Sequence, residues 1–343
     1  MAPDRDDSSN SGAVESYSVG GDLAIASAVL TDDVHSCDDD TYLDNGERGT
    51  LAIQVVNTGW STLSATSVTV SSPNASVSFP GGDTFSLPAT SAFQAATLNV
   101  PVDLSGAAAG ELLSFSIQAD DPGLLTPGPR TLAVTDVAQV DETPAFTDSF
   151  EPHGLLWTVD DLLAGSAGNG WSRLEVSPGA HEAHVDDAGG PSDWSLESPP
   201  IVVSPVDPLT ITFQHRHSFE YDATYDWDGA VLEVTTDGTT WTDLGASASP
   251  GYTGTLTTIS GNTLGGRAAW TGVSAGYPSM QSVTVALGTS YAGQTIRFRF
   301  RIGTDQAAGA PGWWIDDVSV SGAVVAPFVA LVPETGSCSA LAV

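Results

Sequence analysis

Short runs of alternating apolar and polar residues fill the first third of the chain. In the run 111–119, the apolar side chains of Leu113, Phe115 and Ile117 alternate with polar ones, which is the pattern of a β-strand with one buried face. Turn-forming Gly, Pro, Asn and Asp residues separate such runs. Strands are expected at 23–30, 50–57, 64–72, 75–79, 95–104, 111–119 and 130–137. These short strands predict an immunoglobulin-like β-sandwich over residues 21–140.

Longer and more aromatic strands follow a proline-containing joint at 140–146. In the run 295–303 the apolar residues from Ile296 to Ile302 take one face, and Arg297, Arg299 and Arg301 take the other. Residues 230–245 predict a hairpin with an Asp-Gly turn. No helical pattern or internal repeat interrupts the strands, so the chain is expected to be all-β, with a jelly-roll sandwich over residues 144–322. Residues 1–20 predict an acidic linker, and residues 323–343 predict a tail that runs back over the surface.

The net charge of −33 restricts the possible partners. Only nine residues are basic, against 42 acidic ones, so the chain repels nucleic acids and anionic membrane surfaces. Three explanations of the acidity remain open: charge for solubility, adaptation to high salt, and carboxylates gathered to bind hard cations.

The two cysteines, the apolar runs and the N-terminal segment bear on the compartment of the protein. Cys37 and Cys338 lie near opposite ends, and we expect them to form a disulfide, with two free thiols as the alternative. The apolar stretch 323–332 is too short to span a membrane and contains a proline. Residues 1–12 do not resemble a signal peptide, so either the chain is a piece of a longer secreted protein or the protein is intracellular. We favour the first interpretation, because the chain begins with a linker-like segment.

No motif predicts catalysis. His181 and His184 have the wrong spacing for a zinc-protease helix and lie in a strand-and-turn context. His215 and His217 share one face of a predicted strand, which is a spacing that zinc or copper ligands use, but no strong third ligand is visible. The chain is therefore expected not to be an enzyme, and chemistry at the two histidines is kept as an alternative.

One acidic cluster lies in the segment 37–49. Asp38, Asp40, Asp44 and Glu47, together with Asp39, surround Gly46 in a loop that is able to place several oxygen atoms around a calcium ion. The spacing is not that of an EF-hand. The competing interpretation is a solvated turn.

A second acidic cluster interrupts the predicted strand 313–320. In an unbroken strand Trp313, Ile315 and Asp317 share one face while Asp316, Val318 and Val320 share the other, so one aspartate should point into the core. An unpaired buried carboxylate is costly and needs a partner.

A calcium ion is the partner that we expect for this buried aspartate. Asp228 precedes a strand, and Glu151 lies on the first strand of the region, which often lies beside the last one. The arginines of the run 295–303 are the competing partners.

Motifs in the second region resemble a known module. The segments 146–151, 192–201, 213–220, 226–234, 266–272, 291–305 and 311–322 are similar, in this order, to a MAM-like jelly-roll module in the C-terminal regions of secreted bacterial metallopeptidases of the fungalysin-like and immune-inhibitor-A-like kinds. Residues 37–59 resemble the adhesion-related immunoglobulin-like domain that often precedes it.

This resemblance implies extracellular accessory modules with structural calcium. It implies calcium ligation by Glu151, Asp228, Asp316 and Asp317, and also by Asp38, Asp40, Asp44 and Glu47. The catalytic helix of those peptidases is absent from this chain.

The sequence therefore predicts a non-catalytic, calcium-stabilised, secreted accessory or adhesion module of a larger metallopeptidase. Its expected partner is an extracellular polymer or protein surface, or an adjoining catalytic domain. Two alternatives remain: a structural subunit of an extracellular filament or surface layer, and a carbohydrate-binding module. The tryptophans considered for stacking on sugar rings are Trp60, Trp171, Trp194, Trp227 and Trp270.

Overall fold

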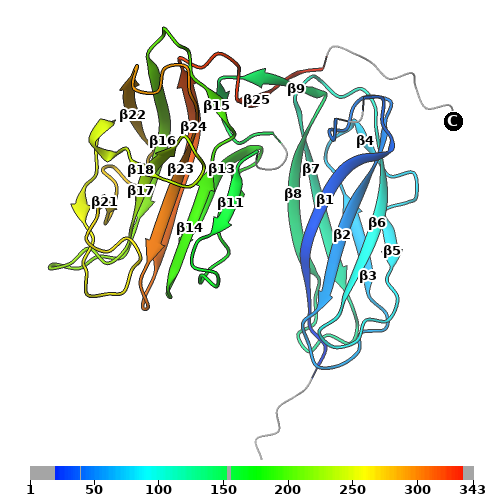
Figure 1. The fold of residues 1–343 in the computed structure, drawn as a ribbon. Coiled ribbons are helices and arrows are strands. Elements are labelled where there is room, and N and C mark those ends of the chain that lie inside the picture. The colour runs from blue at the N-terminus through cyan, green and yellow to red at the C-terminus, as the bar shows by residue number, and fades with distance from the viewer. Residues whose placement is uncertain (1–19, 39, 153–155, 335–343) are drawn as a thin grey trace, which may run out of the picture. The chain divides into compact units, whose positions relative to one another are not determined.

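The computed structural model describes residues 20–38, 40–152 and 156–334. These residues form β-strands, turns and one short 3₁₀ helix at Gly245–Ser247, with no α-helix among them, which confirms the all-β class. The chain divides between Ala138 and Gln139 into two compact units, each made of antiparallel sheets (Figure 1). No helix of the described residues is long and apolar enough to cross a membrane.

The first unit consists of two four-stranded sheets. One sheet has the order β1 (Leu23–His35), β2 (Arg48–Asn57), β6 (Ala95–Leu104) and β4 (Val77–Ser78), and the other has the order β5 (Thr84–Ser86), β3 (Ser67–Ser71), β7 (Glu111–Asp120) and β8 (Arg130–Ala138). The alternate apolar residues of β2 and β7 are buried in one core, as their period-two patterns predict. The pattern did not predict β5, because three residues are too few to show alternation.

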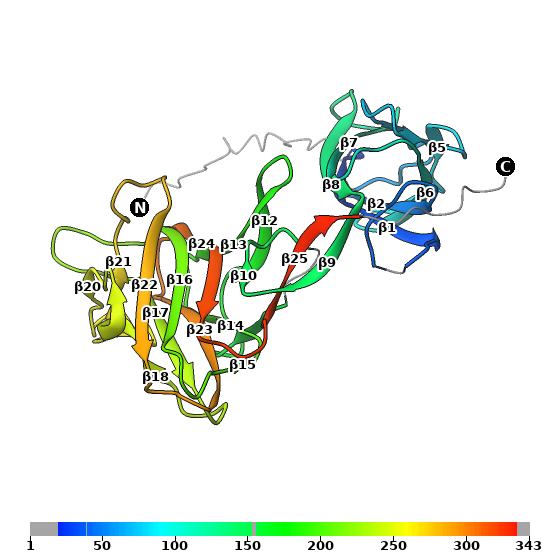
Figure 2. The same cartoon turned by 90° about the horizontal axis from the view of Figure 1, so that it is seen from above.

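The second unit is a larger sandwich of two sheets (Figures 1 and 2). The first has the order β12 (Ser172–Ser177), β13 (Ala180–Asp187), β24 (Ala310–Ser321), β16 (Leu209–Ser218), β22 (Gln281–Gly288) and β19 (Ala248–Ser249), with β10 (Thr147–Asp148) beside β24. The second has the order β11 (Thr158–Asp161), β14 (Ser192–Glu197), β23 (Thr295–Thr304), β17 (Gly229–Thr235), β21 (Ala268–Thr271) and β20 (Gly254–Thr255), with β15 (Ile201–Val202) beside β23 and β18 (Thr242–Asp243) beside β17.

Aromatic side chains fill the core between these sheets. Trp313 of β24 lies within ring-contact distance of Trp270, Phe300 and Trp171, with centroid separations of 5.8, 5.5 and 5.4 Å. Such edge-to-face and tilted pairs stabilise a core beyond the area that they bury.

The second unit extends past both of its predicted boundaries. β9 (Val140–Ala145), in the expected joint, pairs with β25 (Phe328–Pro333), in the expected surface tail. Phe328 is 2% exposed and stacks on Trp157 at a centroid distance of 5.7 Å. This apolar anchor explains why residues 328–333 belong to the sandwich instead of running over its surface.

Candidate metal centres

Four acidic residues meet at one end of the second unit. Asp187 ends β13 and Glu220 follows β16, both in the first sheet, whereas Asp228 precedes β17 and Asp305 follows β23 in the second sheet. Because β17 and β23 are antiparallel neighbours, the start of one lies beside the end of the other. The four carboxylates therefore come from strand ends of both sheets.

The carboxylates of this group are close together. Glu220, Asp228 and Asp305 each offer an oxygen atom within 4.8 Å of the others. Asp187 accepts a hydrogen bond from the backbone N–H of Glu220 at 2.7 Å, and its carboxyl group is close enough to that of Asp228 to raise the pKa of Asp228. Asp228 is fully buried, and Asp187 and Asp305 are 3% and 7% exposed. We call these four residues the sheet-bridging acid group.

Several oxygen atoms of this group have no protein partner. Oδ1 of Asp187, Oε2 of Glu220 and Oδ2 of Asp228 are buried and accept no hydrogen bond. No arginine or histidine of the described residues forms an ion pair with any member of the group. Burial, followed by the proximity of Asp187, raises the pKa of Asp228, and burial also raises the pKa of Asp187. Buried and unpartnered carboxylate oxygens fit a site for a hard cation.

An asparagine fixes the position of Asp228. The Asn262 side-chain amide donates to Oδ1 of Asp228 at 3.2 Å, to the carbonyl of Trp227 at 3.0 Å and to the carbonyl of Gly303 at 2.7 Å. The backbone N–H of Asp305 also donates to Oδ1 of Asp228, at 2.7 Å. These bonds leave Oδ2 as the atom that faces the other acids without a partner.

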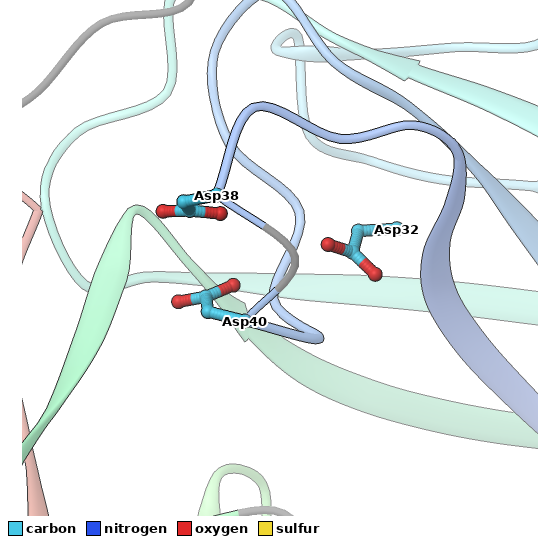
Figure 3. A group of neighbouring side chains, drawn as sticks. All are labelled: Asp32, Asp38 and Asp40. Carbon is cyan, nitrogen blue, oxygen red and sulfur yellow. The ribbon is translucent and has the colours of Figure 1, made fainter.

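A smaller group of acids lies in the first unit. The carboxylates of Asp32, Asp38 and Asp40 converge within 4.8 Å, with Asp32 on β1 and the other two in the loop that follows (Figure 3). Asp32 is 7% exposed, and Oδ2 atoms of both Asp32 and Asp40 are buried without a hydrogen-bond partner. Burial, followed by the neighbouring acids, raises the pKa of Asp40 to about 7. We call these three residues the β1-loop acid group.

Glu47, a predicted ligand, holds the shape of this loop. It is fully buried, and its oxygens accept hydrogen bonds from the backbone N–H groups of Cys37, at 2.6 Å, and Asp44, at 2.9 Å. Asp44 is buried in the same loop, and Asp39 lies outside the described residues. Glu47 therefore fits a role in fixing the loop better than a role as a ligand.

Glu151, Asp316 and Asp317 lie apart from the sheet-bridging acid group that contains Asp228. Glu151 accepts from the backbone N–H of His181 at 3.1 Å, and its Oε2 lies 2.9 Å from Nδ1 of the same histidine. β10 pairs with β24, as expected for the first and last strands. Burial raises the pKa of Asp316 to about 7, and the nearby Glu182 and Glu151 add to this rise. No group of three described acids with converging oxygens contains Asp316 or Asp317.

A β-bulge removes the need for an aspartate in the core of β24. The pairing with β16 changes register between Asp316 and Ser319, and Asp317 has a positive φ of 50°. The extra residue changes which face the following side chains take, so Trp313, Ile315, Val318 and Val320 are all buried. Asp316 is half-buried and Asp317 is exposed, so the expectation that one aspartate points into the core is wrong.

The arginines of β23 pair with other acids. Arg297 pairs with Glu197, Arg299 with Glu233 and Arg301 with Asp193, each at 2.7 Å. These acids come from the neighbouring strands β14 and β17, so the arginine row forms ion pairs within its own sheet.

No group of three or more converging metal-ligand side chains among the described residues contains a histidine of either pair. His215 and His217 are fully buried among aromatic rings, and burial lowers the pKa of His215 to about 3 and that of His217 to about 4. Nδ1 of His215 lies 3.2 Å from the indole N–H of Trp313, which donates to it. His181 and His184 lie on β13, in a strand as expected.

Sequence reasoning found Asp38, Asp40 and Asp228 but missed four other members of the two groups, namely Asp32, Asp187, Glu220 and Asp305. Asp187, Glu220 and Asp305 each lie within two residues of a strand end. This position can be read from the sequence, but many other acids share it, so it does not single these three out. Only the pairing of the strands brings them together. Cys338 lies outside the described residues, so the disulfide with Cys37 stays a prediction.

No protein-family model matches the chain, and no curated protein matches it. Solved structures similar to it include TmCBM61 in complex with β-1,4-galactotriose (11% identity, 48% of this chain and 88% of that one, TM-score 0.29). They also include the secreted serine protease VesC from Vibrio cholerae (11% identity, 89% and 51%, TM-score 0.25) and the CBM22 tandem domain of Xyn10C from Paenibacillus barcinonensis (8% identity, 90% and 95%, TM-score 0.28). These scores are too low to support an argument about ligand or activity.

Proposed function

We propose that this chain is a non-catalytic extracellular binding module whose two sandwiches are stabilised by calcium, one site in each unit. The observation that supports the proposal is the sheet-bridging acid group, in which buried carboxylate oxygens of Asp187, Glu220 and Asp228 have no partner in the protein. A cation at this position offsets the repulsion among the acids and links strand ends of both sheets.

The chemistry of both acid groups favours calcium over other metals. All the ligand atoms are carboxylate oxygens, which hard cations prefer, whereas zinc and copper favour histidine and cysteine. Calcium accepts six to eight oxygens in irregular arrangements, whereas magnesium demands a smaller octahedral site. Strand ends from two sheets provide an irregular arrangement of this kind.

The role in a larger secreted metallopeptidase follows from the sequence resemblance and remains part of the proposal. In that setting, the two sandwiches present a stable surface to a polymer, a cell or a neighbouring catalytic domain. Calcium at extracellular concentrations keeps such a surface folded.

Thermal unfolding with calcium and with a chelator tests the proposal. A cation that binds only the folded state at about 100 times its dissociation constant adds roughly 2.7 kcal/mol of stability. We expect calcium to raise the melting temperature of the second unit, and we expect Asp228→Asn to abolish this rise.

Asp148→Asn is the matched control. Asp148 is also a buried aspartate, but its two oxygens accept hydrogen bonds from the Phe150 backbone and the Trp157 indole, each at 2.8 Å. This variant should lose stability and keep the calcium response. Identical melting curves of the wild-type protein in calcium and in chelator would falsify the proposal.

A further inference from the structure

One pair of large aromatic side chains stands out on the surface of the first unit. Trp60 is 71% exposed and Phe93 is 53% exposed, and their rings meet edge to face at a centroid distance of 4.9 Å. Of the other tryptophans considered for stacking on sugars, Trp171 and Trp270 are buried in the core of the second unit, and Trp194 and Trp227 are half-buried. Trp60 is thus the candidate that the fold leaves open to solvent.

The two rings are placed together by neighbouring strands. Trp60 lies in the turn after β2 and Phe93 in the turn before β6, and these strands are antiparallel partners, with Val56 opposite Ala95. The backbone N–H of Phe93 donates to the carbonyl of Asn57 at 2.9 Å. The end of one strand and the start of the next therefore present both rings at one end of the sheet.

Asn57 holds these turns in place. Its side chain is 1% exposed and donates to the carbonyls of Ser61, at 2.8 Å, and Thr90, at 2.9 Å, while accepting from the N–H of Gly59 at 3.0 Å. A Cβ on Gly59 would lie 2.2 Å from the backbone nitrogen of Asp22, so only glycine fits there. The turn that carries Trp60 is therefore preorganised, which lowers the entropy cost of binding a ligand.

The backbone of Phe93 is strained. Its φ is 60°, in the left-handed region, which costs a bulky residue roughly 1–2 kcal/mol. Its side chain is more than half exposed, so burial in the core does not repay this cost. Strain retained at an exposed aromatic residue is typical of a binding site.

The chain segments that carry the pair are uncharged, in a protein with a net charge of −33. Residues 49–82 and 84–102, which contain both turns, include no Asp, Glu, Lys or Arg. The nearby Asp22, whose carbonyl accepts from the turn, is itself paired with Arg130 at 2.6 Å. The segments that carry the two rings therefore offer a charged ligand no ion pair of their own, whereas the C–H face of a neutral sugar needs only the exposed rings.

We propose that Trp60 and Phe93 form a binding platform for a neutral polysaccharide. The C–H face of a pyranose ring stacks on the open face of the Trp60 indole, and Phe93 packs edge to face against the indole ring. The surface area of two rings is far smaller than the roughly 800 Å² that each partner buries in a stable protein interface. A site of this size therefore favours a sugar chain over a protein as the ligand. The inference names a ligand class for the proposed binding module, but it uses a site separate from the acid groups.

Binding to a panel of neutral glycans tests the platform. The probes are soluble galactan, xylan and mixed-linkage β-glucan in affinity electrophoresis, and insoluble cellulose and chitin in sedimentation assays. We expect the full chain to bind at least one of them, and Trp60→Ala to weaken this binding at least about tenfold, because a stacked aromatic ring often dominates the affinity of a site. Tyr225→Ala, which removes a 41% exposed ring from the second unit, is the matched control and should bind like the wild type.

Phe93→Gly separates binding from folding. Glycine adopts a φ of 60° freely, so this variant should not lower the urea midpoint of unfolding, yet it should weaken glycan binding. The inference is overturned if no glycan of the panel binds, or if Trp60→Ala binds as tightly as the wild type. Because Asp228→Asn should retain glycan binding, loss of the calcium response and loss of the platform are distinguishable.

Discussion

Asp228 illustrates how a single residue depends on its surroundings. In the sequence it is one of 42 acids, but in the fold it is fully buried, is hydrogen-bonded by Asn262 and faces Asp187. Burial and repulsion raise its pKa, so without a cation the group retains protons at pH values where an exposed aspartate is ionised. Calcium must displace these protons, and so binding couples to pH.

The calcium response should therefore grow as the pH rises. Burial and mutual repulsion raise the carboxyl pKa values of the Asp187–Asp228 pair, so the folded, cation-free chain binds more protons than the unfolded chain above about pH 4. Its stability therefore falls as the pH rises through these raised pKa values. Bound calcium offsets this loss of stability, because it binds the ionised carboxylates of the folded chain. We expect the calcium-induced rise in melting temperature to be larger at pH 8 than at pH 5, as measured by differential scanning calorimetry.

Asp228→Asn provides the check on this prediction. The melting temperature of its second unit should be nearly the same with and without calcium at both pH values, whereas the first unit keeps its own acid group. A calcium-induced shift in the wild-type protein that is equal at pH 5 and pH 8 would contradict the linkage to the buried carboxyl groups.

At the scale of the element, the bulge in β24 determines which side chains reach the core. Trp313 and Ile315 precede it and Val318 and Val320 follow it, and all four are buried only because Asp317 takes an extra position with a φ of 50°. The exposed side chain of Asp317 makes no core contact. Its backbone conformation is what the strand requires.

Substitutions at Asp317 should therefore follow backbone preference. The free energy of unfolding of Asp317→Gly should lie within about 1 kcal/mol of that of the wild type, because glycine adopts a positive φ freely. Asp317→Val should be less stable than Asp317→Gly by about 1–2 kcal/mol, because a β-branched residue is strained in the left-handed region. Urea unfolding measures both, and equal stability of the two variants would argue against the bulge.

At the scale of the whole molecule, the predicted disulfide between Cys37 and Cys338 would close almost the entire chain into one loop. Cross-links of this length restrict the unfolded chain by about 5 kcal/mol in the entropy model, although measured gains are often smaller. We expect no free thiol in denatured, non-reduced protein, and a lower unfolding midpoint after reduction. Thiol titration measures the first, and two reactive thiols per chain would exclude the bond.

Local patterns in the sequence predicted most of the strands. The alternation in 111–119 and 295–303 identified β7 and β23 and their buried faces, because a strand places successive side chains on opposite sides whatever it packs against. The turn at Asp237 was equally local, since its carboxylate accepts from the N–H groups of Thr239 and Thr240. The all-β class follows from such signals alone.

Tertiary structure decided the features that depend on pairing between distant segments. β25 pairs with β9, and its Phe328 side chain is buried in the core. The bulge at Asp317 depends on the register of β24 against β16. The sheet-bridging acid group draws on the ends of four strands, β13, β16, β17 and β23, spread over residues 180–304. An acid at the end of a strand looks the same in the sequence whether it faces water or three other carboxylates, because only the order of strands in the sheets decides which strand ends become neighbours.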